Sequence, residues 1–108
     1  METFKGLWTS ENGDGTYVTS VSNIPLDVLN PEQVLLQVFY SSLNYKDALS
    51  SSGHRGITRN FPHIPGIDAA GIVINDPSGK FKAGSQVIIT GFDLGMNAHG
   101  GLSEYVSI

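Results

Sequence analysis

Hydrophobic and polar positions alternate along Gln33–Ser41, and the alternation stops at the polar segment that follows. Val34, Leu36, Val38 and Tyr40 recur with a period of two, and the stretch is rich in β-branched and aromatic residues. This period and this composition are typical of a strand in a mostly buried sheet. The pattern therefore predicts a long central strand that ends just before a change of structure.

The segment after this strand predicts a short helix over Tyr45–Ser51. Asn44 is a favoured N-cap residue, and Asp47 falls in the first turn, where a negative charge stabilises a helix. Gly53 suits the left-handed conformation that often follows a helix. Polar side chains thus lie where a strand passes into a helix, a position at which many functional sites are built.

Shorter hydrophobic runs predict five further strands. They lie in Phe4–Thr9, Thr16–Val21, Pro65–Ile74, Ser85–Thr90 and Leu102–Ile108. Asn-Gly and Asp-Gly pairs within Asn12–Gly15 predict a tight type I′ hairpin between the first two, and the prolines of Ile24–Pro31 predict an irregular crossing. About six strands and one short helix at this spacing predict a mainly β fold, a small closed or partly open barrel.

Two long segments without periodicity carry the three histidines. Gly53–Pro65 contains His54 and His63, and Gly91–Gly101 contains His99. Long loops in compact domains are usually functional or mobile. The histidines have no i, i+3 or i+4 spacing, so we expect surface positions and no metal site built from them.

Composition limits the function. A chain of 108 residues forms one domain, and its net charge of −4 with six Lys and Arg argues against nucleic acid and anionic membranes as partners. No apolar stretch is long enough to span a membrane and no signal peptide is visible, so we expect a cytoplasmic protein. The absence of cysteine excludes thiolate catalysis and thiolate-bound metals within these residues.

Five segments, in this order, resemble the N-terminal catalytic domain of medium-chain dehydrogenases/reductases. They are Tyr40–Leu49, Pro65–Gly71, Val87–Gly91, Leu94–Asn97 and Gly100–Tyr105. Within that superfamily the chain is similar to the zinc-free quinone oxidoreductases, a subgroup that includes acrylyl-CoA reductase. The resemblance implies a GroES-like, partly open β-barrel over residues 1–108, with one or two short helices. It also implies that the nucleotide-binding Rossmann domain is absent from this chain, and no Gly-x-Gly-x-x-Gly motif is found between a strand and a helix.

The resemblance implies NADPH as the cofactor of the whole enzyme and no zinc. Asn44 stands where zinc-dependent relatives have a catalytic cysteine, and Ile67 stands where they have a histidine. An amide and an isoleucine do not replace a thiolate and an imidazole around Zn²⁺. The resemblance implies hydride transfer to a quinone or to an enoyl-CoA double bond, and we expect no metal to polarise the carbonyl.

By the same resemblance, Asn44 and Tyr45 border the nicotinamide as catalytic residues, and Tyr45 is the expected hydrogen-bond donor to the developing enolate. The expected cofactor-binding residues are Asn44, Tyr45, Lys46, Asp47 and Asp68, and the expected substrate-binding residues are Arg55, Arg59, Asn97 and His99. Simpler roles remain open for several of them. Asn44 can be a cap alone and Tyr45 a packed aromatic residue, and Lys46 and the two arginines can be solvated charges. Asp47 can be a structural residue that stabilises the first turn of the helix, and Asp68 can be an acid in a buried turn that orients its neighbours.

We expect this chain to be inactive without the rest of the enzyme and to form homo-oligomers. The alternative is a non-catalytic GroES-like interaction module, as in the co-chaperonins of this fold. Those proteins dock through an apolar tripeptide in a mobile loop, and Gly53–Phe61 has no such tripeptide. A nucleotide-binding fingerprint encoded downstream of residue 108 distinguishes the reductase from the module.

Overall fold

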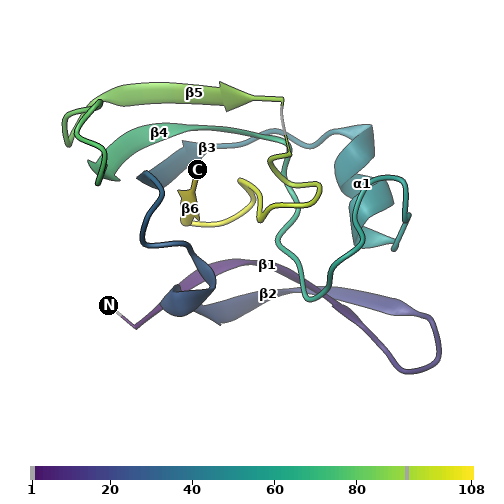
Figure 1. Ribbon diagram of the computed structural model, residues 1–108. Coiled ribbons are helices and arrows are strands. Elements are labelled where there is room, and N and C mark those ends of the chain that lie inside the picture. The colour runs from purple at the N-terminus through teal and green to yellow at the C-terminus, as the bar shows by residue number, and fades with distance from the viewer. Residues whose placement is uncertain (1, 92) are drawn as a thin grey trace.

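The computed structural model describes residues 2–91 and 93–108, and it contains two antiparallel sheets (Figure 1). Strands β1 (Thr3–Glu11) and β2 (Tyr17–Pro25) form a hairpin. The other sheet has the strand order β5-β4-β3-β6. Its strands are β3 (Leu35–Tyr40), β4 (Asp68–Asn75), β5 (Gln86–Thr90) and β6 (Tyr105–Ser107), and the helices are the 3-10 helix η1 (Leu26–Val28) and α1 (Tyr45–Ser51).

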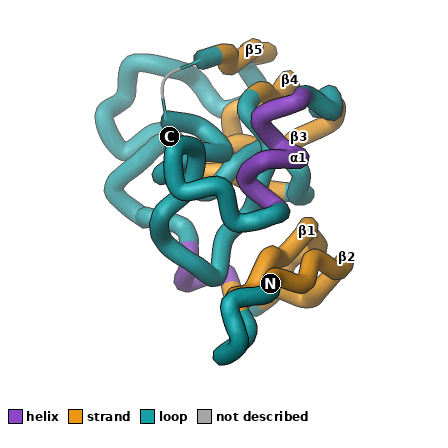
Figure 2. Tube along the Cα trace, turned by 90° about the vertical axis from the view of Figure 1, so that its right-hand side faces the viewer, coloured by secondary structure: helices purple, strands orange, loops and turns teal. Residues whose placement is uncertain are grey.

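The two sheets face each other without closing into a continuous barrel, which confirms the mainly β, partly open fold predicted from the sequence. Both views place α1 between the four-stranded sheet and the hairpin (Figure 2). The bounds of α1 are those predicted, and Gly53 has a positive φ of 86° just after the helix. None of the described helices is long and apolar enough to cross a membrane.

Two clusters of buried side chains stabilise the sheets. Leu36, Val73 and Val106, on three neighbouring strands, belong to the cluster of the four-stranded sheet. Phe4 and Ile24 of the hairpin belong to the other. The alternation along the central strand reflects an inner face at Leu36, which is buried together with its cross-strand partners Val73 and Val106. The expected burial is wrong at the end of the strand, where Tyr40 is 77% exposed.

The hairpin prediction is right, but the turn differs from the one expected. Residues 12–16 form a five-residue loop, in which Asn12 N–H donates to the Thr16 carbonyl at 2.8 Å. The Asp14 carboxylate also accepts bonds from the Thr16 amide and hydroxyl. These side-chain bonds stabilise a wider loop, and Gly15, with a φ of 84°, is the glycine with a positive φ in it.

Segments from the two ends of the chain meet at the outer edge of β1. Leu7 N–H donates to the Leu102 carbonyl at 2.9 Å, and Glu104 N–H donates to the Lys5 carbonyl at 2.8 Å. Lys5 N–H in turn donates to the Glu104 carboxylate at 2.6 Å. The hairpin is therefore held to the rest of the fold by residues nearly one hundred positions away.

Gly71 in β4 is a position where only glycine fits. A Cβ atom there would overlap the carbonyl oxygen of Gln37 on the neighbouring strand β3. The close approach of β3 and β4 brings the end of β3 beside the start of β4, and the candidate site lies at this junction.

Candidate functional site

Asp68, the first residue of β4, holds the segment that follows β3. Its Oδ1 accepts the Ser42 backbone N–H at 2.9 Å, and its Oδ2 accepts the Ser42 hydroxyl at 2.5 Å. The Asn44 side-chain amide also donates to Asp68 Oδ2, at 3.2 Å. The same amide nitrogen lies 3.2 Å from Ser42 Oγ. Three polar residues from two strand ends thus form one hydrogen-bonded network.

This network keeps Asp68 ionised. The bond from the Ser42 hydroxyl is the largest cause and lowers the Asp68 pKa, and it outweighs burial, the next cause, which raises the pKa. The Ser42 backbone N–H and the Asn44 amide lower the pKa further. An ionised carboxylate accepts hydrogen bonds and donates none. Asp68 therefore orients Ser42 and Asn44, as the sequence analysis allowed, although it lies in a strand and is half-buried where we expected a buried turn.

Asp47 forms a second link, between α1 and the chain that precedes β4. Asn44 is the N-cap of α1, and its N–H donates to Asp47 Oδ2 at 2.8 Å as part of a capping box. The other carboxylate oxygen accepts the Ile67 N–H at 3.0 Å. Asp47 is only 3% exposed. Its contacts make it a structural residue that fixes the start of α1 against Ile67.

The side chains beside this network are uncovered. Tyr40, Leu43 and Tyr45 are 77%, 80% and 79% exposed, values unusual for large apolar side chains. Lys46 is exposed as well. The Tyr45 hydroxyl has no hydrogen-bond partner in the described part of the chain. We call Tyr40, Leu43 and Tyr45 the lip. The lip offers aromatic ring surface and the free hydroxyl of Tyr45 next to an ordered polar network.

The two arginines lie apart from the network. Arg55 and Arg59 are exposed on the loop after α1, where Arg59 Nε donates to the Arg55 carbonyl at 3.4 Å. Neither forms a hydrogen bond to the network or a salt bridge within residues 2–91 and 93–108. Their role in binding an anionic substrate stays a prediction.

The expected surface position of the histidines is wrong for His63. His63 is 2% exposed and its ring stacks on His99, with 5.8 Å between ring centroids. His63 Nε2 bonds the Gly95 carbonyl at 2.9 Å, and His99 Nδ1 accepts the Ile64 N–H at 3.2 Å. His99 and Asn97 line a pocket of about 230 Å³ that no residue of the network or the lip lines. No three His, Asp or Glu side chains of the described chain gather as a metal site requires.

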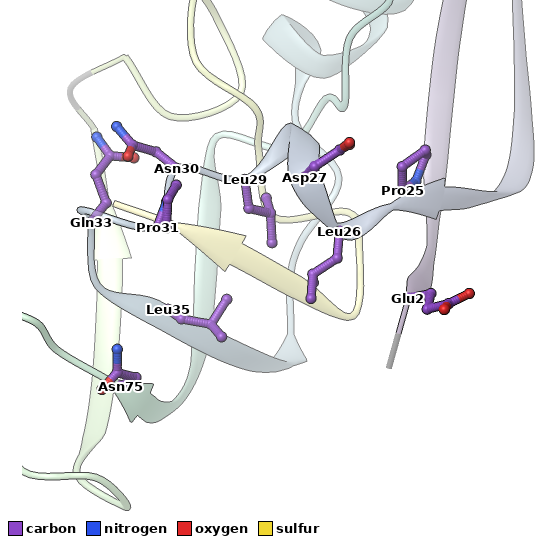
Figure 3. Close-up of a pocket in the computed structure, with 10 residues that line it drawn as sticks. All are labelled: Glu2, Pro25, Leu26, Asp27, Leu29, Asn30, Pro31, Gln33, Leu35 and Asn75. Atoms are coloured by element: carbon purple, nitrogen blue, oxygen red, sulfur yellow. The ribbon is translucent and has the colours of Figure 1, made fainter.

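A larger pocket, of about 700 Å³, lies between η1 and the start of β3 (Figure 3). Leu26, Leu29 and Leu35 point toward one another in it, and Pro25 and Pro31 complete its apolar part. None of the predicted site residues, all of which the structure describes, lines this pocket. Its position separates it from the network at the other end of β3.

Sequence reasoning missed two residues. Ser42 lies inside the motif of Tyr40–Leu49 and received no role, and its position two residues before the cap was the only available signal. His63 was assigned to the surface because Gly53–Pro65 has no periodicity. Its burial follows from long-range contacts: backbone bonds with Thr9, and stacking on His99.

Comparisons with known proteins agree with this architecture. The chain is 41% identical over 105 residues to YhfP of Bacillus subtilis, which is named for quinone oxidoreductase activity, and 44% identical over 98 residues to AcuI of Escherichia coli, which is named for acrylyl-CoA reductase activity. These alignments cover 97% and 91% of this chain, and 32% and 30% of the relatives. The chain thus spans about a third of the length of the relatives it matches.

Solved structures superpose closely. The crystal structure of YhfP with NAD bound matches all of this chain and 32% of its own, with a TM-score of 0.91 at 39% identity. YhdH of Escherichia coli with bound NADPH matches 95% of this chain and 32% of its own, with a TM-score of 0.87 at 43% identity. The family described as the alcohol dehydrogenase GroES-like domain matches residues 30–108. With most of its length matched, this chain belongs to the alcohol dehydrogenase GroES-like domain family.

Proposed function

We propose that this chain is the catalytic-domain part of an NADPH-dependent oxidoreductase that reduces a quinone or an enoyl-CoA double bond. The observation that carries the proposal is the pair of relatives above 40% identity, whose names give these two activities. Bound NADPH in the YhdH structure supports the choice of cofactor. Because the relatives are about three times longer, the activity is proposed for the whole protein.

The lip and the network fit the uncharged end of this cofactor. Tyr40 and Tyr45 expose aromatic rings against which a flat nicotinamide can pack. The nearby carboxylate of Asp68 is stabilised by three hydrogen bonds within the protein. Lys46, exposed at the start of α1, can meet a phosphate. When bound, NADPH supplies the hydride for the reduction.

The donor set does not fit zinc. Asn44 offers an amide whose nitrogen already donates to Asp68, and Ile67 has no donor atom in its side chain. Structural and catalytic zinc sites use thiolates, imidazoles and carboxylates. We therefore propose no step that involves a metal.

Without a metal, the developing negative charge on the substrate oxygen needs a hydrogen-bond donor. Tyr45 carries a free hydroxyl at the lip and directly follows Asn44, so we assign it this role. Asn44 is held by Asp68 and Asp47, so its position is fixed before substrate binds. Asp68 and Asp47 act as positioning residues through Asn44.

The test is Tyr45→Phe in the intact protein, with Tyr40→Phe as a control of similar exposure. Loss of a donor to an oxyanion lowers kcat by about 100- to 1000-fold. We expect a fall of this order in kcat/KM for Tyr45→Phe with NADPH and either acrylyl-CoA or a quinone, and unchanged thermal stability. Tyr40→Phe should keep its activity. Near wild-type rates in both variants would show that Tyr45 has no role in the mechanism. If neither acrylyl-CoA nor a quinone supports NADPH oxidation by the intact protein, the proposed function is refuted.

A further inference from the structure

The stacked pair of His63 and His99 is an unusual feature that the reductase proposal does not use. The two rings lie 5.8 Å apart with an angle of 25° between their planes, and Trp8 lies against the other side of His99 with centroids 5.9 Å apart. Phe61 contacts His63 edge to face. Two imidazoles are thus fixed in one orientation by aromatic neighbours.

The protein contacts of the pair determine which nitrogen of each ring carries a proton. A carbonyl oxygen accepts only, so His63 Nε2, at 2.9 Å from Gly95 O, is the donor and Nδ1 is left as an acceptor. His99 Nδ1 accepts the Ile64 N–H, so Nε2 of His99 carries its proton. Burial lowers the pKa of both rings, which keeps them neutral at neutral pH.

The remaining acceptor of His63, Nδ1, forms no hydrogen bond within the described residues, although His63 is only 2% exposed. The pocket of about 230 Å³ borders both histidines. Each of these two histidines thus has one ring nitrogen without a partner among the described residues, an acceptor on His63 and a donor on His99.

The rest of the pocket wall is uncharged and mixes polar side chains with the apolar Val28, Pro62 and Ala98. Its other hydrogen-bonding side chains are those of Asn30, Gln33, Asn60, Asn97 and Ser107, and no Lys, Arg, Asp or Glu lines it. Carboxamides donate and accept equally well. At roughly 30 Å³ for one water, the pocket has room for a ligand that replaces about seven or eight waters. A dinucleotide or an acyl-CoA does not fit this volume.

The pocket also lies away from the lip. Gln33 lines it just before β3, whereas Asn44 follows the other end of that strand. At about 3.3 Å per residue, the length of β3 separates these ends by about 17 Å. The inference is thus independent of the proposed reductase function.

We propose that this pocket is a binding site for a small uncharged cyclic amide, such as a lactam or a single heterocyclic base. A cyclic amide has its N–H and C=O side by side, so it can donate to His63 Nδ1 and accept from His99 Nε2. The carboxamides around the pair bond the remaining polar groups, and the absence of charged residues disfavours anions and cations of the same size.

Trp8 provides the readout, because it contacts His99. The intact protein is labelled with fluorotryptophan, and the Trp8 fluorine resonance is identified by its loss in Trp8→Phe. The probe is δ-valerolactam, with cyclohexanone as the ring without N–H and piperidinium as the cation. We expect the lactam to shift the resonance saturably, with a Kd in the millimolar range or tighter, as for a ligand of this size.

Asn60→Ala and Asn97→Ala should each weaken lactam binding by about threefold to tenfold, as expected for one lost hydrogen bond. Asn23→Ala, an exposed carboxamide on β2 outside the pocket, is the matched control and should leave binding unchanged. Equal shifts with lactam and cyclohexanone, an unchanged affinity in both pocket variants, or no saturable shift with the lactam would each overturn the proposal.

Discussion

Asp47 offers the most direct test of how the site is held together. Its carboxylate accepts the Asn44 N–H at 2.8 Å and the Ile67 N–H at 3.0 Å, and it is 3% exposed. Asp47→Ala removes both bonds and leaves two backbone donors without their partner. A hydrogen bond to a charged group contributes about 1.5–3 kcal/mol. Because Asn44 and Ile67 are half-buried, water can reach the freed N–H groups in part, and we take the lower value for each bond.

The expected loss is therefore about 3 kcal/mol in the free energy of unfolding, out of a total of about 5–15 kcal/mol for a typical domain. Urea unfolding of the variant and of the wild type at neutral pH measures the difference. Asp47→Asn, which keeps one carbonyl oxygen as an acceptor, should lie between the two. Asp27→Ala is the control, since this exposed carboxylate in the first turn of η1 should change stability by about 0.5 kcal/mol or less.

Amide hydrogen exchange separates this explanation from a general loss of packing. In Asp47→Ala, the amides of Asn44 and Ile67 should exchange faster relative to those of β3 and β4. A loss of under about 1 kcal/mol, with exchange at these two amides unchanged, would refute the assignment of Asp47 as the link between α1 and Ile67.

Four further predictions follow from other features. Gly71→Ala should destabilise the fold severely, because the new methyl group overlaps the carbonyl of Gln37, whereas Gly13→Ala has no atom within 4 Å and should be tolerated in thermal unfolding. Folding lowers the pKa of His63 and His99 below the usual 6.5, so as the pH falls the unfolded chain takes up protons before the folded one. The free energy of unfolding should therefore decrease as the pH drops below about 6.5. Urea midpoints that stay constant from about pH 7.5 to about pH 5 would contradict this expectation. Elemental analysis of protein purified without chelators should find well under one zinc per chain. A ratio near one that is retained on dialysis would show that the protein binds zinc despite its lack of suitable ligands at positions 44 and 67. The 108-residue chain alone should self-associate through its open strand edges and should not oxidise NADPH. A strict monomer in light scattering, together with micromolar NADPH binding in a titration, would contradict both expectations.

The sequence predicted well those features that depend on neighbours along the chain. The period of two in β3 and the capping residues Asn44 and Asp47 are local signals, so the helix was found at the right residues and the strand to within two residues at each end. The hairpin was found for the same reason. The conformation of its loop was not predicted, because the hydrogen bonds between Asp14 and Thr16 favour a wider loop than the type I′ turn that Asn-Gly and Asp-Gly pairs prefer.

Features that depend on distant contacts were beyond local patterns. Asp68 and Ser42 are 26 positions apart, and nothing in either segment encodes their bond. His63 lies in a segment without periodicity, and its burial depends on the approach of the loop that carries His99, 36 positions later. The polar network and the histidine pair both arise only when the fold brings remote segments together.

The contacts at the outer edge of β1 have a consequence for synthesis of the protein. Lys5 and Leu7 pair with Glu104 and Leu102, which a ribosome adds almost one hundred residues later. At about 5–20 residues per second, this takes roughly 5–20 s. During that time the outer edge of β1 near Lys5 and Leu7 has no partner, although Thr9 can already pair with His63, and an isolated hairpin is marginally stable in water. The nascent N-terminal segment therefore leaves the ribosome with an unpaired edge, and it stays dependent on protection from other chains until residue 104 has emerged.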